Sequence, residues 1–250
     1  AGARYADDVR ATLERLAASG GAPAAFIAEP LYGNAGGVEL PAGYLAEAYR
    51  LVRAAGGLAI ADEVQVGLGR TGEAVWAFER EGVEPDVVTI AKAAGNGVAL
   101  GAVITRRELA DRFRDEGSFF SSVGGSPVSC AAGIAVLDVL RDEGLQENAR
   151  VVGAHLKARL AALGDRHPLV GAAHGVGLYL GLELVRDRET LEPAREETLA
   201  ICDRLLELGI VVQPTSDGYN VLKIKPPMCL TQASADYFVD ALDHVLTTGW

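Results

Sequence analysis

Residues 58–72, LAIADEVQVGLGRTG, begin as a short apolar run that ends in an acidic residue and turns into a polar, glycine-rich loop. The run from Leu58 to Ala61 is apolar at odd and even positions alike, which is typical of a strand covered on both faces. Asp62 then stands at the carboxyl end of this strand. Because ligands of open α/β sheets bind at that edge, Asp62 is a candidate functional residue.

A second apolar run, DVVTIA at residues 86–91, ends directly in Lys92. If the two strands lie near one another, the carboxylate of Asp62 and the amine of Lys92 face the same crevice. An amine in this place forms an imine with an aldehyde, and a nearby carboxylate keeps a heterocyclic nitrogen protonated, as pyridoxal phosphate chemistry requires. The alternative is a loop-capping Asp62 and a solvated or salt-bridged Lys92, which the spacing alone does not exclude.

The wider pattern predicts two domains. Between residues 24 and 105, apolar runs alternate with helical stretches, which predicts an α/β fold with a mainly parallel sheet. Two helices follow, at residues 127–142 and 145–163, with Gly144 as the break between them. After that the elements group as α+β. We therefore expect a large-domain portion at residues 1–145 and a small C-terminal domain at residues 146–250.

The composition excludes several classes of partner. The chain has 34 Asp and Glu against 23 Lys and Arg, a net charge of −11 that repels nucleic acid and anionic lipid. Its longest nearly uncharged apolar stretch, residues 97–105, is far shorter than the roughly 20 residues of a membrane helix. The 4 histidines show no metal-ligand spacing, so we expect no metal site. The 3 widely spaced cysteines form no CxxC pair, which favours a reducing compartment, the cytoplasm.

The chain resembles the class III family of aminotransferases, which are fold type I pyridoxal phosphate enzymes. The resemblance rests on several segments across the chain: the Glu-Pro of AAFIAEP (24–30), IADEVQVGLGRTG (60–72), PDVVTIAK (85–92), GAVI (101–104) and SVGGSPVSCAAG (122–133). It implies that Lys92 is the Schiff-base lysine and proton shuttle and that Asp62 is the partner of the pyridine nitrogen. It also implies three further cofactor-binding residues, namely Val64 on the ring face, Gln65 at the phenolic oxygen and Glu29 as a more distant carboxylate.

The resemblance also implies a homodimer with shared active sites. Before its double glycine the family usually has a threonine that reaches the cofactor phosphate bound by the neighbouring subunit. Ser122 stands at that place here and keeps the hydroxyl. The alternative is an ordinary loop serine, and Val123 departs from the usual aromatic residue.

One departure bears on the reaction. Many family members carry an arginine before a Pro-Pro pair near the C-terminus, where it clamps a substrate carboxylate, whereas this sequence has Lys223 in VLKIKPPMCL. This segment and HGVGLYLGLEL (174–184) are most similar to the ethanolamine-phosphate phospho-lyase and alanine-glyoxylate aminotransferase 2-like branch. The resemblance therefore implies an enzyme acting on a small primary amine, by transamination to a 2-oxo acid or by elimination of phosphate. Lys223 and Lys225 are candidates for contacting that phosphate, although alternating charges on an edge strand are more often its wet face.

Two competing interpretations remain. GLGRTG at residues 67–72 matches the GxGxxG dinucleotide fingerprint, but DEVQV separates it from its strand and no acid ends the following strand. The other interpretation is a catalytically incomplete fragment or assembly module. The phosphate loop and the ring-stacking aromatic residue that the family carries upstream cannot be placed in residues 1–28, and the opening reads as a helix already under way. We therefore expect a missing N-terminal part and weak or no cofactor binding by this piece alone.

Overall fold

The computed structural model describes residues 1–250 and divides the chain into two compact units, each of which is described separately below. The main division falls between Glu143 and Gly144, close to the expected boundary after residue 145. Two early segments, Leu31–Glu39 and Gly69–Val75, belong to the second unit and not to the large-domain portion in which the sequence analysis placed them. They do so because their contacts are with residues more than 70 positions further along the chain.

The sheet of the first unit has the predicted α/β character. Its strand order is β1-β4-β5-β6, with bounds Ala25–Ala28, Leu58–Asp62, Val87–Ile90 and Ala102–Thr105. The first three strands are parallel to one another, and β6 runs antiparallel to β5. The predicted α/β fold with a mainly parallel sheet is therefore confirmed.

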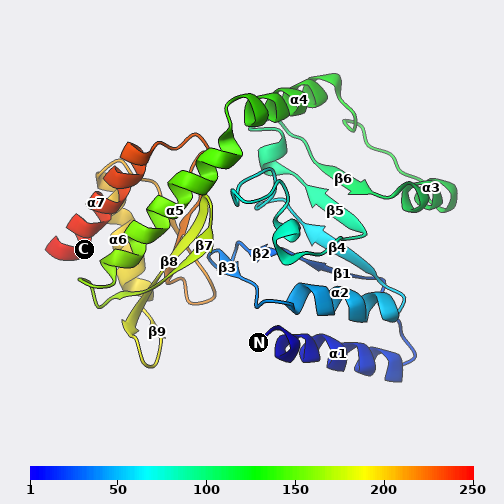
Figure 1. The fold of residues 1–250 in the computed structure, drawn as a ribbon, viewed down its shortest axis with the longest axis horizontal. Coiled ribbons are helices and arrows are strands. Elements are labelled where there is room, and N and C mark those ends of the chain that lie inside the picture. Colours follow the sequence, from blue (N-terminus) through cyan, green and yellow to red (C-terminus); the bar gives the residue numbers. More distant parts are fainter. The chain divides into compact units, whose positions relative to one another are not determined.

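Two helices are layered on one face of this sheet (Figure 1). The helix α2 (Tyr44–Ala54) packs on β1 and β4, and α1 (Gly2–Ala18) packs on α2. The ring of Tyr49 is 1 % exposed and meets Phe26 edge to face at 6.2 Å between centroids. Cross-strand register puts Ile27 and Val103 on the opposite face, where they are 58 % and 67 % exposed. The opposite face of the sheet is thus an exposed apolar surface.

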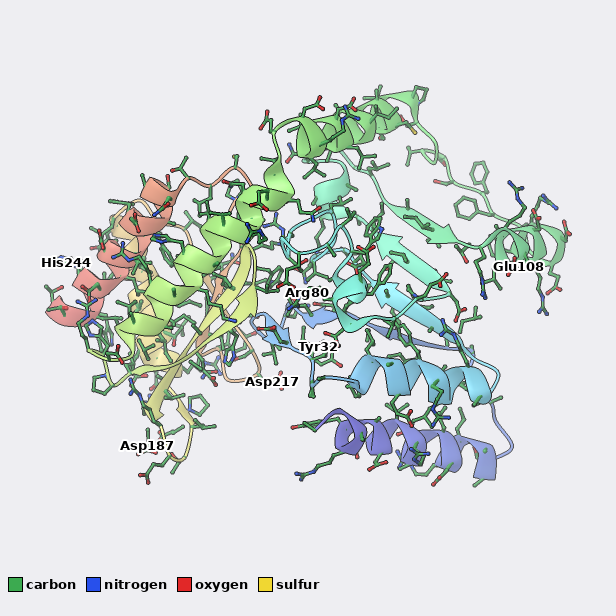
Figure 2. The ribbon with its side chains drawn as sticks, viewed as in Figure 1. Tyr32, Arg80, Glu108, Asp187, Asp217 and His244 are labelled. Carbon is green, nitrogen blue, oxygen red and sulfur yellow. The ribbon has the colours of Figure 1, made fainter.

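The other helical elements of the first unit follow β4, β5 and β6 in the chain. These are the 3₁₀ turns η1 (Ala77–Glu81) and η2 (Lys92–Ala94) and the helices α3 (Arg107–Glu116) and α4 (Pro127–Asp142). The bounds of α4 agree with the prediction, and Pro127 opens the helix as its fixed φ favours. The helix α3 was not predicted. It has no buried residue, and Glu108 projects from it into solvent (Figure 2).

The second unit contains an antiparallel sheet of order β10-β11-β8-β7, with β9 paired to β8. The bounds are β7 Val170–Val176, β8 Tyr179–Asp187, β9 Glu192–Pro193, β10 Gln213–Thr215 and β11 Val221–Ile224. A small hairpin of β2 (Leu31–Tyr32) and β3 (Val38–Glu39) also belongs to this unit. The strand β11 is an interior strand, so the expectation that Lys223 and Lys225 lie on an edge strand was wrong.

Three helices enclose the core of this unit. They are α5 (Leu145–Leu163), α6 (Arg195–Glu207) and α7 (Gln232–Thr248), which carries His244 in Figure 2. The hydroxyl of Thr231 accepts the Ser234 N–H at 3.1 Å and caps α7. The core includes fully or almost fully buried leucines from both layers, among them Leu156, Leu160, Leu182 and Leu222. None of the helices of the protein combines the length and the apolar character that crossing a bilayer requires.

Candidate active site

Three parallel strands of the first unit end at the same edge of the sheet, and each delivers one candidate side chain. Ala28 of β1 pairs with Ala61 of β4, and Asp62 of β4 pairs with Thr89 of β5. Glu29 follows β1 directly, Asp62 is the last residue of β4, and Lys92 comes two residues after the end of β5. The prediction that the strands ending in Asp62 and Lys92 are neighbours is confirmed.

Asp62 opens a tight turn that also carries Val64 and Gln65. Its Oδ1 accepts a hydrogen bond from the Val64 N–H at 3.0 Å, which fixes the orientation of the carboxylate. The next residue, Glu63, donates its N–H to the Thr89 carbonyl at 3.0 Å and so extends the ladder between β4 and β5 by one bond. Val64 is half-buried and Gln65 is 9 % exposed, so this turn packs as firmly as the strand before it.

Lys92 is exposed and adopts a left-handed backbone conformation, with φ 49°. A non-glycine residue in this region costs on the order of 1–3 kcal/mol, and such strain is typical of functional positions. The Lys92 carbonyl accepts the Gly95 N–H at 3.2 Å and starts the turn η2. This geometry ends the strand abruptly and places an exposed ammonium group at the sheet edge that carries Asp62.

Glu63 is a site residue that the sequence analysis missed. Its carboxylate is buried, at 2 % exposure, and accepts the backbone N–H groups of Ala77 and Phe78 at 3.0 and 2.9 Å. Burial raises the pKa of Glu63 to about 7, although the two N–H groups oppose this shift. The signal available in the sequence was the Asp-Glu pair at the end of an apolar strand. Successive side chains of a strand point to opposite faces, so one of two adjacent acids is expected to turn inward.

The loop before α4 carries Ser122. Ser122 and its neighbours are exposed, and the Ser121 hydroxyl accepts the Gly124 N–H at 2.9 Å within the loop. Phe119, Phe120 and Val123 are 77 %, 88 % and 76 % exposed, so the loop presents an apolar surface. The role expected for Ser122 belongs to a site shared by two subunits and stays a prediction.

Lys223 lies on β11 in the second unit, directly opposite Gly181 of β8. Its Nζ donates to Asn34 Oδ1 at 3.1 Å. The Nζ atoms of Lys223 and Lys225 lie 5.9 and 5.8 Å from the ring centroid of Tyr179, so two ammonium groups face one aromatic ring. The Tyr179 ring is buried, whereas Lys223 is half-buried and Lys225 exposed, so the two lysines form a small cationic surface beside this ring, which suits an anionic group.

Arg70 and Gly72 of the glycine-rich motif pack against other elements of the second unit. Its Nη1 donates to the carbonyls of Leu178 and Pro226 at 3.1 and 2.9 Å, and burial lowers its pKa. A Cβ on Gly72 would lie 2.6 Å from the Arg150 backbone, so a side chain there would collide with α5. Residues 69–72 of this motif therefore have a packing role within the second unit, in place of the dinucleotide-binding role of the competing interpretation.

Comparisons with known proteins agree with this geometry. The family model described as Aminotransferase class-III matches residues 3–246. The chain is 46 % identical over 246 residues to alanine–glyoxylate aminotransferase 2 homolog 2 of Arabidopsis thaliana, covering 98 % of this chain and 51 % of that protein. It is 40 % identical over 250 residues to ethanolamine-phosphate phospho-lyase homolog 1 of Caenorhabditis elegans, covering 99 % and 54 %.

A solved structure is also similar. A phospholyase from Arthrobacter in complex with phosphoethanolamine superimposes with a TM-score of 0.94 and 36 % identity, covering 98 % of this chain and 58 % of that one. The chain spans about half the length of the curated relatives it matches. With strand order, strand-end residues and family match in agreement, this chain belongs to the class III aminotransferase family.

Proposed function

We propose that the full-length protein is a pyridoxal phosphate-dependent enzyme that transfers the amino group of a small primary amine to a 2-oxo acid. The observation that carries this proposal is the register between β4 and β5, which brings Asp62 and Lys92 to neighbouring strand ends. Membership of the class III aminotransferase family supports it. This cofactor needs an amine for its aldehyde and a carboxylate for its ring nitrogen, and both lie at one sheet edge here.

The residues present fit the cofactor. Lys92 provides the amine, Asp62 the carboxylate for the pyridine nitrogen, and Gln65 an amide for the phenolic oxygen, while Val64 offers an apolar ring contact. Glu29 stands as a second carboxylate at the adjacent strand end. When bound, pyridoxal phosphate supplies an aldehyde that condenses with amines and a ring that withdraws electrons from the attached carbon.

Lys92 and Asp62 have different tasks in the reaction. Lys92 would hold the cofactor aldehyde through its amine and would then take a proton from the carbon that carries the substrate amino group. Asp62 would hold the proton on the ring nitrogen, and the hydrogen bond that it accepts from the Val64 N–H fixes the orientation of its carboxylate. In transamination, Lys92 would give this proton up again, and in the overall exchange the amine substrate becomes a carbonyl product while the 2-oxo acid becomes an amino acid.

We also propose that the enzyme is a homodimer in which Ser122 binds the cofactor phosphate of the neighbouring subunit. The exposed apolar residues around Ser122 support an interface at this loop. For localisation we propose the cytoplasm, on the basis of the cysteine pattern. Fractionation of cells that express the full-length protein tests this, and recovery in an organelle fraction would contradict it.

The second candidate function is elimination of phosphate from phosphoethanolamine or a similar phosphorylated amino alcohol. The pair of ammonium groups of Lys223 and Lys225 above Tyr179 favours it, because two point charges suit a phosphate dianion, and Lys223 lacks the planar fork that clamps a carboxylate. In this reaction Lys92 removes the same proton, and the carbon–oxygen bond to the neighbouring phosphate breaks. The phosphate leaves with the bonding electron pair, and no 2-oxo acid is consumed.

One experiment separates the two reactions. Full-length protein is given phosphoethanolamine alone and, separately, ω-amino acids with pyruvate or glyoxylate, and inorganic phosphate and amino products are measured. Amino transfer without phosphate release supports the transaminase, whereas phosphate release without an amino acceptor selects the phospho-lyase. Lys92→Ala should abolish either activity and the visible absorbance of the lysine-bound cofactor. Retention of both in this variant would contradict the proposed function.

A further inference from the structure

Glu63 links the turn after β4 to two other parts of the first unit through its backbone and side chain. Its N–H donates to Thr89 of β5, and its carbonyl accepts the Gly67 N–H, each at 3.0 Å. Its two carboxylate oxygens accept the N–H groups of Ala77 and Phe78 at the start of η1. The residue therefore ties the turn after Asp62 both to the neighbouring strand and to a segment 14 residues further along the chain.

The side chain of Glu63 lies against the turn itself. A Cβ on Gly67 would come within 3.0 Å of Glu63 Oε2 and 2.9 Å of its carbonyl oxygen, so the turn closes tightly around this side chain. Of the two acids at this strand end, Asp62 is half-buried and available to a ligand, while Glu63 is buried against protein donors. A second nearby acid, Glu79, is exposed and caps η1 through the Trp76 N–H at 2.9 Å.

Both hydrogen bonds depend on the two oxygens that the carboxyl group of Glu63 offers. Each oxygen faces a different backbone N–H, so a side chain with one oxygen and one amide group would satisfy only one of them and would point its own N–H groups at the other. A buried N–H without a partner costs more than a solvated one, so the turn and η1 separate more easily when one bond is lost.

We propose that Glu63 is a positioning residue for the cofactor: by holding the turn between β4 and η1 it fixes Asp62, Val64 and Gln65 in the arrangement that pyridoxal phosphate requires. This inference rests on the proposed function, because it assigns those three residues to the cofactor. Glu63 contacts neither substrate nor cofactor. It acts through the backbone of the turn, in the way that supporting hydrogen bonds preorganise other binding sites.

The test uses full-length protein with Glu63→Gln, which keeps the size of the side chain and removes one acceptor. Cofactor is titrated into the apo forms by absorbance and fluorescence, and amide hydrogen exchange is followed in peptides that cover residues 62–80. We expect cofactor affinity to fall roughly tenfold, because one hydrogen bond to a buried backbone N–H is lost. The amides of Ala77 and Phe78 should exchange faster in the variant.

Glu79→Gln is the matched control, because Glu79 also accepts one backbone N–H of the same segment but is exposed and does not contact the turn. It should leave cofactor affinity within about twofold. A Glu63→Gln protein that is less stable but binds cofactor like the wild type would overturn the inference, since the role of Glu63 would then be structural only. Failure of the proposed function gives a different result, namely a wild type that binds no cofactor, and that result overturns both.

Discussion

Asp62 and Thr89 are direct partners in the register of two parallel strands, β4 and β5. Since Lys92 lies three residues beyond Thr89, the pairing sets the position of the amine relative to the carboxylate. Side chains alternate between the two faces along a strand, so a slip of one residue would turn Asp62 to the other face of the sheet. The chemistry proposed here therefore depends on this register.

Asp62→Asn in the full-length enzyme tests the electron-withdrawing role. The asparagine oxygen still accepts the Val64 N–H, so the fold should be kept while the negative charge is lost. We expect turnover to fall on the order of 10²–10⁴-fold, as when a group that controls a proton is removed. Turnover is measured by product formation, and near-ultraviolet circular dichroism checks the fold. Turnover within twofold of wild type would contradict the role of Asp62.

Lys223→Ala tests the anion-binding role of the cationic surface. Because a charge-assisted hydrogen bond is lost, we expect KM for phosphoethanolamine to rise roughly tenfold or more, with kcat little changed. Steady-state kinetics with varied substrate measures both. Lys157→Ala is the control, since Lys157 pairs with Glu39 in the same unit. An equal rise of KM in both variants would show that the effect of Lys223 is not specific.

The buried carboxyl of Glu63 predicts a pH dependence of stability. Its pKa rises from 4.5 to about 7 on folding. Between these values the folded protein holds a proton that the unfolded chain has released, so a rise in pH favours unfolding. We expect the free energy of unfolding to fall across this window, by on the order of 3 kcal/mol for this group.

Chemical denaturation of the full-length protein at pH 5 and pH 8 measures this slope, and Glu63→Gln should lack it. The ionised state of Glu63 is opposed by burial and by the nearby carboxylates of Glu79 and Asp62. Asp86 contributes in a different range, because its pKa is lowered from 3.8 and its stabilisation is lost only on further acidification. Equal slopes in the wild type and in Glu63→Gln would refute the assignment.

The close packing of Gly153 in α5 predicts the sign of the stability change that Gly153→Ala causes. A Cβ at this position would lie 2.1 Å from the Gly177 carbonyl oxygen, in the turn between β7 and β8. Helix propensity alone predicts that Gly153→Ala stabilises the protein, whereas we expect a loss of about 1–3 kcal/mol from the forced separation of helix and hairpin. Ala154→Gly, at the exposed neighbour, reports the propensity effect alone. Thermal unfolding that shows Gly153→Ala to be stabilised would contradict the packing argument.

The 250-residue chain alone should bind pyridoxal phosphate weakly or not at all. It spans about half the length of its curated relatives, and the face of its first sheet that carries Ile27 and Val103 is exposed. Such parallel sheets are normally covered on both faces. Cofactor absorbance is compared between this chain and the full-length protein. Full visible absorbance of the lysine-bound cofactor in the isolated chain would show the prediction to be wrong.

Local sequence signals predicted elements that depend on nearby residues. The helices α4 and α5 have the expected bounds because Pro127 opens the first and Gly144, with φ 60°, separates it from the second. The same signals failed where tertiary contacts decide. The polar composition of residues 213–220 indicates a loop, but β10 occupies Gln213–Thr215, and Asn220 is 4 % exposed and donates to the Leu184 carbonyl at 3.0 Å.

By itself, the sequence determined the family, the α/β order of elements, and Asp62 and Lys92 as the residues that end two strands. Only the tertiary structure decided that these two strands are neighbours, that Glu63 turns inward to bind η1, and that Leu31–Glu39 and Gly69–Val75 belong to the second unit. The physical reason is the range of the interactions. Capping and periodicity act over a few residues, whereas strand pairing and burial depend on contacts between residues that are far apart in the chain.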